Sequence, residues 1–216
     1  MEPKNIVILA DGSFPQTAYP LSILNKADII ICCDGAILKL LEHTNLMADY
    51  IVGDMDTLDE ENKLKFKDII IHNPDQQTND QTKAFRWALE NVEDISQIYI
   101  LGATGEREDH TIGNISLLME YARTYDLEGR GINVEMVSDH ATIFAVTDTC
   151  EVDCGEGRRI SIFSPDNSLR IKSEGLEWPT DEVVFDNWWK ATLNRASQDH
   201  VKLKFSHRSI ALIMMD

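Results

Sequence analysis

The sequence predicts an α/β N-terminal domain with a mostly parallel sheet, followed by a smaller all-β sandwich domain. Apolar, β-rich runs alternate with helical patterns as far as residue 130, whereas short β-type runs separated by turn residues fill the rest. The early runs are continuously apolar, which is typical of parallel strands covered by helices on both faces. Closely spaced short strands without intervening helices are typical of an antiparallel sandwich or partial barrel.

Hydrophobic patterns identify the elements of the expected parallel sheet. The expected strands are residues 6–10, 29–33, 50–52, 69–72 and 98–101. The expected helices, which lie between or after these strands, are residues 36–43, 60–67, 79–91 and 112–125.

The change of character falls at the double-glycine segment 127–131, where we place the domain boundary. The predicted domains are therefore residues 1–130, which are α/β, and residues 131–216, which are all β. The strands expected in the second domain are residues 133–137, 142–146, 159–163, 169–172, 201–205 and 210–214.

Composition excludes several classes of function. The chain has 216 residues and a formal net charge of −17, which repels nucleic acid phosphates and anionic membrane surfaces. No apolar run approaches the roughly 20 residues of a spanning helix, and no signal peptide is evident, so we expect a cytoplasmic protein. The cysteines lack a zinc-ligand pattern and are expected to be reduced thiols; they are Cys32, Cys33, Cys150 and Cys154.

An acidic pair, Asp54 and Asp56, directly follows the expected strand 50–52. Residues i and i+2 of an extended segment project to the same side, so both carboxylates are able to face one ion while Met55 turns inward. Mg²⁺ prefers oxygen ligands and is commonly held by one or two carboxylates together with substrate phosphates. The pair therefore predicts a magnesium site, with a solvated turn as the alternative.

Other polar loops follow the neighbouring strands. In an open parallel sheet, ligands bind beyond the carboxyl ends of the strands, so these loops are expected to meet at one edge. They carry Asp34 and Gly35, then Asp80, and then Asp109. Each carboxylate also has a structural reading as a turn, a first-turn residue or a helix N-cap. Their joint occurrence at one edge favours the functional reading.

A glycine loop and two basic residues complete this edge. Gly102 and Gly105 allow the backbone to approach a ligand closely, and N–H groups at a helix start favour phosphate oxygens. Lys83 and Arg107 are suited to neutralise phosphate charge. The common P-loop, dinucleotide and zinc-protease motifs are absent from the sequence.

With these motifs, the chain resembles the thiamine pyrophosphokinase (thiamine diphosphokinase) family. The similar segments are distributed over both halves of the chain and are residues 33–36, 53–57, 75–83, 101–110 and 175–179. The resemblance implies a catalytic α/β domain, a β-sandwich that helps to bind thiamine, and a homodimer with active sites between subunits. It also implies the reaction of ATP with thiamine to give thiamine diphosphate and AMP.

The resemblance further implies roles for individual residues. Asp54, Asp56 and Asp80 would hold Mg²⁺ on the ATP phosphates, with Asp109 supporting the same acidic cluster. The general base is left open between Asp80 and Asp109. The ATP-binding set is Asp34, Gly35, Lys83, Gly102, Thr104, Gly105 and Arg107.

For thiamine, the resemblance implies Trp178 as an aromatic wall and Ser197 as a further contact. An aromatic face suits a cationic ligand, because stacking and cation–π attraction act together. Three departures from the family pattern concern how the ligands are seated: Ala36 and Glu106 stand where glycines are usual, and Gln198 follows Ser197 where asparagine is usual.

Two other classes of function remain open from the sequence alone. Residues 54–56 also match the DxD pair of a metal-dependent sugar-nucleotide transferase. A regulator that binds nucleotide or thiamine without turnover would keep the same fold and binding residues.

Overall fold

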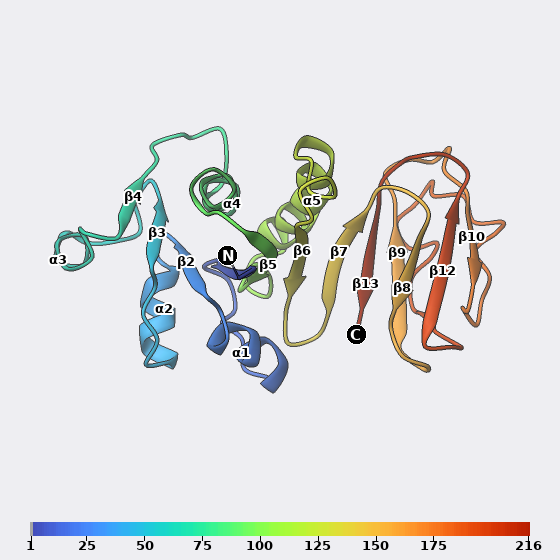
Figure 1. The fold of residues 1–216 in the computed structure, drawn as a ribbon, viewed down its shortest axis with the longest axis horizontal. Helices are drawn as coiled ribbons and strands as arrows, with labels where there is room; N and C mark the ends of the chain where they lie inside the picture. The colour runs from blue at the N-terminus through green and yellow to red at the C-terminus, as the bar shows by residue number, and fades with distance from the viewer. Residues whose placement is uncertain (1) are drawn as a thin grey trace. The chain divides into compact units, whose positions relative to one another are not determined.

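The computed structural model describes residues 2–216, and its contacts divide the chain into two compact units (Figure 1). The first unit reaches to Leu117 and includes Leu127–Asp139, and the second comprises Leu118–Asp126 and His140–Asp216. The predicted domains 1–130 and 131–216 stay a prediction, because contacts do not test whether either part folds alone. Within residues 2–216 no helix is both long and apolar enough to cross a membrane.

The first unit contains a parallel sheet with the strand order β6-β5-β1-β2-β3-β4. Its strands are β1 (Lys4–Leu9), β2 (Ile29–Cys33), β3 (Tyr50–Gly53), β4 (Ile70–His72), β5 (Ile95–Leu101) and β6 (Asn133–Val137). Because β1 pairs with β2 on one side and with β5 on the other, the order reverses beside β1. Open α/β sheets bind their ligands beyond the carboxyl ends of the strands at such a reversal point.

Helices connect these strands and cover the sheet. They are α1 (Ala18–Asn25), α2 (Ala36–His43), α3 (Glu60–Lys65), α4 (Asp80–Asn91) and α5 (Glu108–Thr124). Figure 1 shows α1 and α2 on the opposite side of the sheet from α4. The sequence did not predict α1, because Pro20 interrupts its apolar pattern. Proline is tolerated there because it lies in the first helical turn, whose N–H groups have no intrahelical acceptor.

The core of this unit follows the alternation of side chains along its strands. Val7 and Leu9 of β1 pack in one cluster with Cys32 of β2 and with Leu40 of α2. Phe85 of α4 is also fully buried. Burial of such apolar side chains contributes roughly 1.5–3 kcal/mol each, which fixes the strand ends that carry the polar loops.

The second unit is built of antiparallel strands, which confirms the predicted fold class of an α/β part followed by a β-sandwich. One group has the order β11-β9-β13-β7, and a three-stranded sheet has the order β10-β12-β8. An apolar cluster that includes Ile162, Leu203 and Ile213 joins the two. The strands are β7 (Thr142–Val146), β8 (Cys150–Asp153), β9 (Arg159–Phe163), β10 (Ile171–Glu174), β11 (Asn194–Arg195), β12 (His200–Phe205) and β13 (Ala211–Met215).

Two of these strands, β8 and β11, were not predicted. In β8 only Val152 is buried, and β11 is two residues long, so neither has a strong apolar pattern. Both are defined by pairing with β12 and β9 rather than by their own composition. Such strands depend on tertiary context, which outweighs local preference in sheets.

The loops after β1 and β5 contact each other backbone to backbone. Gly12 donates its N–H to the Gly102 carbonyl at 2.7 Å, and Ser13 donates to the Thr104 carbonyl at 2.9 Å. A Cβ on Gly12 would lie 2.5 Å from the Gly102 oxygen, so only glycine permits this approach. The two loops therefore form one continuous wall at the reversal point of the sheet.

Candidate active site

A cavity of about 550 Å³ lies at the carboxyl edge of the first unit's sheet. The loops that follow β1, β2, β3, β4 and β5 all contribute to its lining, together with the first turns of α4 and α5. This is the position at which open α/β sheets bind ligands. The loops that follow the strands therefore meet at one edge of the sheet, as predicted.

Three carboxylates form a compact group at this edge. Asp34, Asp54 and Asp56 each place an oxygen so that the three atoms lie within 4.8 Å of one another. Met55, between the two aspartates of the pair, is buried and has a positive φ of 63°. Both neighbouring carboxylates serve the same group, as predicted, but through a left-handed conformation at Met55 rather than the extended backbone assumed from the spacing.

Asp34 is the most buried member, with 3% of its surface exposed. Its Oδ2 accepts a hydrogen bond from the Thr57 N–H at 3.1 Å, whereas its Oδ1 has no partner among residues 2–216. Burial raises the pKa of this carboxyl group, against the opposing effect of the Thr57 hydrogen bonds. A buried oxygen without a donor fits a hard divalent cation, which takes oxygen ligands from several carboxylates.

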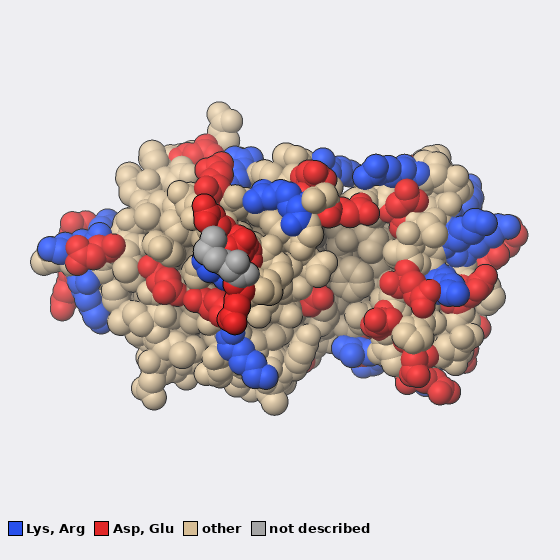
Figure 2. All heavy atoms as spheres, in the orientation of Figure 1, with Lys and Arg blue, Asp and Glu red and all other residues tan. Residues whose placement is uncertain are grey.

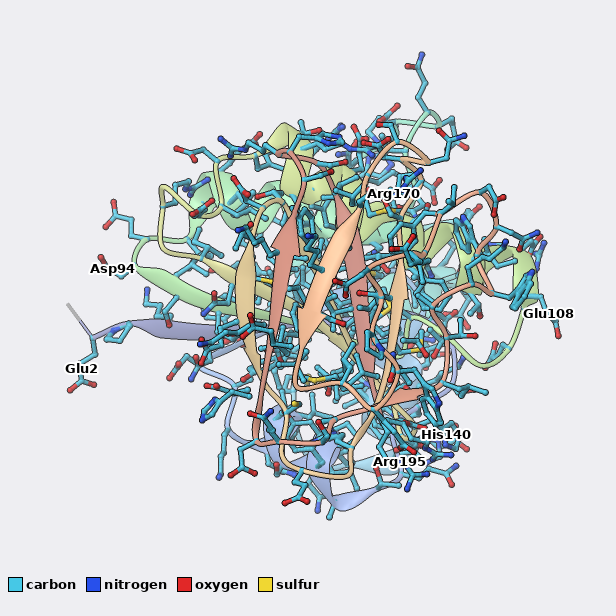
Figure 3. The ribbon with its side chains drawn as sticks, turned by 90° about the vertical axis from the view of Figure 1, so that its right-hand side faces the viewer. Glu2, Asp94, Glu108, His140, Arg170 and Arg195 are labelled. Atoms are coloured by element: carbon cyan, nitrogen blue, oxygen red, sulfur yellow. The ribbon has the colours of Figure 1, made fainter. Side chains whose placement is uncertain are left out.

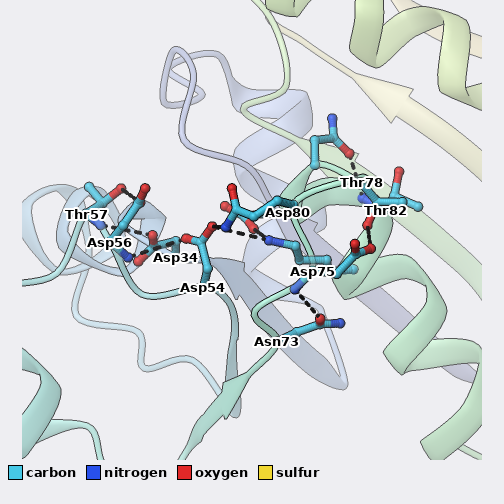
Figure 4. Close-up of polar contacts among 12 residues, drawn as sticks. Asp34, Asp54, Asp56, Thr57, Asn73, Asp75, Thr78, Asp80 and Thr82 are labelled. Carbon is cyan, nitrogen blue, oxygen red and sulfur yellow. Dashed lines mark hydrogen bonds and ion pairs between the residues drawn. The ribbon is translucent and has the colours of Figure 1, made fainter.

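Lys83 offsets the negative charge of two aspartates at this edge of the sheet, Asp54 and Asp80. The Lys83 ammonium lies 2.8 Å from Asp80 Oδ1 and 3.6 Å from Asp54 Oδ2, and its side chain is only 3% exposed (Figure 4). Burial disfavours its charged form, but hydrogen bonding to Asp80 and the charges of both aspartates raise the pKa of Lys83 overall. The lysine therefore stays charged and offsets the repulsion between the two carboxylates.

The loop after β4 places an amide against the acidic pair. Gln76 donates through Nε2 to Asp54 Oδ2 at 2.7 Å, and this bond is the main cause of the lowered pKa of Asp54. Within the loop, Asp75 accepts hydrogen bonds from the Gln77 N–H at 2.9 Å and the Thr78 hydroxyl at 2.7 Å. The side chain of Gln76 is thus held at the cavity by a hydrogen-bonded turn.

Asp80 begins α4, whose N-cap is Asn79. Gly53 lies between Asp80 and Asp34. A Cβ at this glycine would lie 3.2 Å from Asp80 Cγ and 3.0 Å from Asp34 Cβ. The three-carboxylate group described above includes Asp34, whereas the set predicted from sequence contained Asp80. Asp80 lines the cavity beside this group and is paired with Lys83.

The glycine loop after β5 has a backbone conformation that needs its glycines. Gly102 and Gly105 have φ values of 64° and 96°, a region that favours glycine. Arg107 donates through Nε and Nη2 to Asp109 at 3.1 and 2.6 Å. These bonds, followed by those from His110, hold the pKa of Asp109 well below its usual range.

The cavity brings together many of the predicted site residues. Those that line it are Asp34, Gly35, Asp54, Asp80, Lys83, Thr104 and Arg107. Four other predicted site residues are sequence neighbours of lining residues but do not line the cavity themselves; they are Asp56, Gly102, Gly105 and Asp109.

Several lining residues were missed by sequence reasoning. They include Asp11, Gln76, Glu106, His110, Thr111 and Asn114. Asp11 follows β1, so the rule applied to the other strands would have found it. Glu106 and His110 lie next to predicted residues in sequence, whereas Gln76, Thr111 and Asn114 lie farther from them, and the contacts of all five depend on how the loops and helix starts meet.

Lys39 of α2 joins the two loops that form the wall beside β1. Its ammonium donates to the carbonyls of Asp11 and Gly12 at 2.7 and 2.9 Å and contacts Glu106 Oε1 at 2.7 Å. Glu106, which departs from the family's glycine, is therefore an anchor for the glycine loop. A glycine at this position would lack that ion pair.

The predicted thiamine contacts lie in the second unit. Segment 175–178 runs antiparallel to segment 194–197 through the Leu176–Ala196 bridge. Buried Asn194 donates to the Trp178 carbonyl at 2.6 Å and accepts from its N–H at 3.2 Å, while 55% of Trp178 is exposed. Ser197 is exposed on the facing segment, and Figure 3 shows neighbouring Arg195 at the opposite end of the strands from Arg170.

Acidic side chains form several separate groups on the visible face of the molecule, with groups of Lys and Arg among them (Figure 2). This distribution agrees with the formal net charge of −17. Because such a surface repels polyanions, a phosphate ligand needs local compensation of the kind that Lys83 and Arg107 offer.

The parallel sheet, with an acidic cavity beyond the ends of its strands, places the first unit among open α/β folds, and an antiparallel unit follows it. Two family models match this chain. The catalytic domain of thiamin pyrophosphokinase matches residues 21–127, and its substrate-binding domain matches residues 142–211. The chain therefore belongs to the thiamin pyrophosphokinase family of enzymes.

Individual relatives agree with this assignment. Thiamin pyrophosphokinase 1 of Caenorhabditis elegans is 28% identical over 46% of this chain and 43% of the relative. Thiamine pyrophosphokinase of Bacillus subtilis is 34% identical over 56% of this chain and 57% of the relative. The match thus spans about half the length of these relatives. The crystal structure of the B. subtilis thiamine pyrophosphokinase has a TM-score of 0.77 at 19% identity and covers 99% of each chain, which shows a shared fold.

Replacing Lys83 tests the charge compensation. Lys83→Met leaves Asp54 and Asp80 without their cation, so we expect the free energy of unfolding in metal-free buffer to fall by about 1.5–3 kcal/mol. Lys63→Met is the matched control, because Lys63 forms an exposed pair with Glu60 and its loss should cost about 0.5 kcal/mol or less. Urea denaturation measures both values, and equal effects would contradict a special role for Lys83.

Proposed function

We propose that this protein is a thiamine diphosphokinase, which transfers a pyrophosphoryl group from ATP to the hydroxyl of thiamine and releases AMP. The observation that carries the proposal is the Asp34–Asp54–Asp56 group beside Lys83, in a chain that both family models match. Oxygen ligands and one buried cation are the components that a metal–nucleotide substrate needs. Cytoplasmic localisation stays a prediction.

We propose that Mg²⁺ is the cofactor and that Asp54 and Asp56 hold it, with a third carboxylate from Asp34 or Asp80. Bound Mg²⁺ neutralises phosphate charge in such sites. Asp34 fits this role through its unpartnered buried oxygen, whereas Asp80 already accepts from Lys83.

The remaining cavity residues bind and orient the nucleotide in this proposal. Thr104 of the glycine loop lines the cavity and offers its backbone to phosphate oxygens, Gly102 and Gly105 give this loop its conformation, and Lys83 and Arg107 supply positive charge. Asp34 and Gly35 form the wall at the end of β2. Fixed donors of this kind stabilise the charge that develops on departing AMP.

Asp80 is the better candidate for the general base. It lines the cavity, whereas Asp109 is bound by Arg107 and His110 and its pKa is lowered well below the usual range. A lowered pKa makes a carboxylate a weaker proton acceptor. We therefore propose that Asp80 takes the thiamine hydroxyl proton and that Asp109 holds Arg107 in position.

Product analysis tests the activity directly. The purified protein is incubated with ATP, Mg²⁺ and thiamine, and the products are identified by mass spectrometry. Thiamine diphosphate together with AMP is the expected result, and thiamine monophosphate with ADP would contradict pyrophosphoryl transfer. Ligand binding without any product would instead support a non-catalytic binding protein, and turnover of a UDP-sugar would support a sugar-nucleotide transferase.

Replacing either aspartate of the pair tests the metal site. Asp54→Asn and Asp56→Asn each remove a negatively charged oxygen ligand, so we expect kcat to fall at least about a hundredfold while the fold is retained. Asp94→Asn is the control, because Asp94 is exposed on the loop before β5 and Asn tolerates its positive φ. A wild-type rate for Asp56→Asn at saturating Mg²⁺ would refute its role.

Replacing the exposed tryptophan tests the thiamine site. Loss of cation–π attraction costs roughly 0.5–2 kcal/mol, so Trp178→Ala should raise the KM for thiamine about 2- to 30-fold. Trp178→Phe should restore most of the affinity, because the aromatic face remains. Trp189→Ala is the control, since Trp189 is similarly exposed but was not assigned to the substrate. An unchanged KM in Trp178→Ala would remove this residue from the site.

We also propose a homodimer with active sites between subunits. The expected mass in sedimentation equilibrium is twice the 24.5 kDa of one chain. Mixed dimers of Asp56→Asn and Trp178→Ala should recover turnover at low thiamine, because one of their two sites then receives neither substitution. A monomeric mass would contradict the dimer, and absence of recovery in proven mixed dimers would contradict shared sites.

A further inference from the structure

Two asparagines connect the glycine loop to the start of α4 through side-chain amides. Asn114 of α5 donates through Nδ2 to the Ala103 carbonyl at 2.8 Å. Its Oδ1 accepts from Asn79 Nδ2 at 2.9 Å, and Asn79 Oδ1 in turn accepts from the Thr82 N–H at 3.0 Å. These bonds form an unbroken chain between two walls of the cavity.

The backbone groups at its two ends fix the direction of this hydrogen-bond chain. The Ala103 carbonyl only accepts, and the Thr82 N–H only donates. Each amide must therefore turn its NH₂ group toward Ala103 and its oxygen toward Thr82. An aspartate at either asparagine position would place an acceptor against an acceptor, so the chain requires Asn at both.

Helix capping alone does not account for Asn79. Aspartate caps helix N-termini as well as asparagine does, and Asp59 caps α3 by accepting from the Asn62 N–H at 2.8 Å. What aspartate lacks is the donor that reaches Asn114. Asn114 is itself only 9% exposed, lines the cavity, and accepts at its carbonyl from Gln81 Nε2 at 3.4 Å.

We propose that Asn79 and Asn114 are positioning residues, which set the glycine loop at a fixed distance from Asp80 and Lys83. The inference rests on the proposed pyrophosphoryl transfer. Ala103 lies between Gly102 and Thr104, and Asn79 directly precedes Asp80, so the chain couples the nucleotide-facing loop to the carboxylate and ammonium opposite it. Small displacements between such walls lower the rate of group transfer more than they alter binding of a remote substrate part.

The test is a mutant cycle on Asn79→Asp and Asn114→Asp, with exposed Asn167→Asp as a control that adds the same charge. Asn79→Asp keeps the helix cap but loses the bond to Asn114, so we expect a folded protein with a lower urea midpoint, kcat about tenfold lower and the KM for thiamine within about twofold. Asn114→Asp should lower kcat up to about a hundredfold, and the double variant should resemble it, because both substitutions break one chain. A wild-type kcat in Asn79→Asp, or effects that multiply, would overturn the proposal.

Amide hydrogen exchange gives a readout that does not require turnover. Asn79→Asp retains the acceptor for Thr82, so exchange at this amide should stay at the wild-type rate. Exchange at the loop amides of Gly12, Ser13 and Gly105 should rise at least about threefold, because the anchor of the glycine loop is lost. Unchanged exchange at those amides would overturn the inference, whereas a wild-type protein that forms no thiamine diphosphate would overturn the proposed function instead.

Discussion

Repulsion among the carboxylates at the carboxyl edge of the sheet is the constraint that the rest of the site has to satisfy. Two unit charges within 4.8 Å, as in the Asp34–Asp54–Asp56 group, repel by about 3–4 kcal/mol at an effective dielectric constant near 20. The chain offsets this in two ways, because Lys83 lies beside Asp54 and Gln76 donates to Asp54. Burial adds to the cost of the charge on Asp34 and raises its pKa. What remains is negative and suited to a divalent cation.

This compensation requires the loops to keep fixed positions relative to one another, and the parallel sheet holds them there. The reversal of strand order beside β1 brings the loops after β1 and β5 together, and the lack of a side chain at Gly12 lets their backbones bond directly. Lys39 then holds the carbonyls of Asp11 and Gly12 with one ammonium group that also reaches Glu106. The departure from glycine at position 106 therefore has a structural reason in this chain.

The sequence predicted the strand-end loops well, because parallel topology alone places them at one edge. It did not predict that Asp34 rather than Asp80 lies within the three-carboxylate group. That outcome depends on the positive φ values of Asp34 and Met55, which no local pattern indicates. It also missed Asn114, since 35 residues separate Asn79 from its partner and only the fold brings the two side chains within hydrogen-bond distance. Local periodicity predicts elements, whereas such contacts follow from how the elements meet.

The same repulsion accounts for the use of neutral amides in the hydrogen bonds that support the cavity walls. Further aspartates at these supporting positions would add to the repulsion among the carboxylates, and buried carboxylates without cations are costly. Neutral amides avoid this: Asn79, Asn114 and Gln76 form or orient the walls with hydrogen bonds and add no charge. Because each amide donates as well as accepts, the direction of the bonds is also fixed. The carboxylates of the cavity are thereby left for the cation and the transferred phosphates.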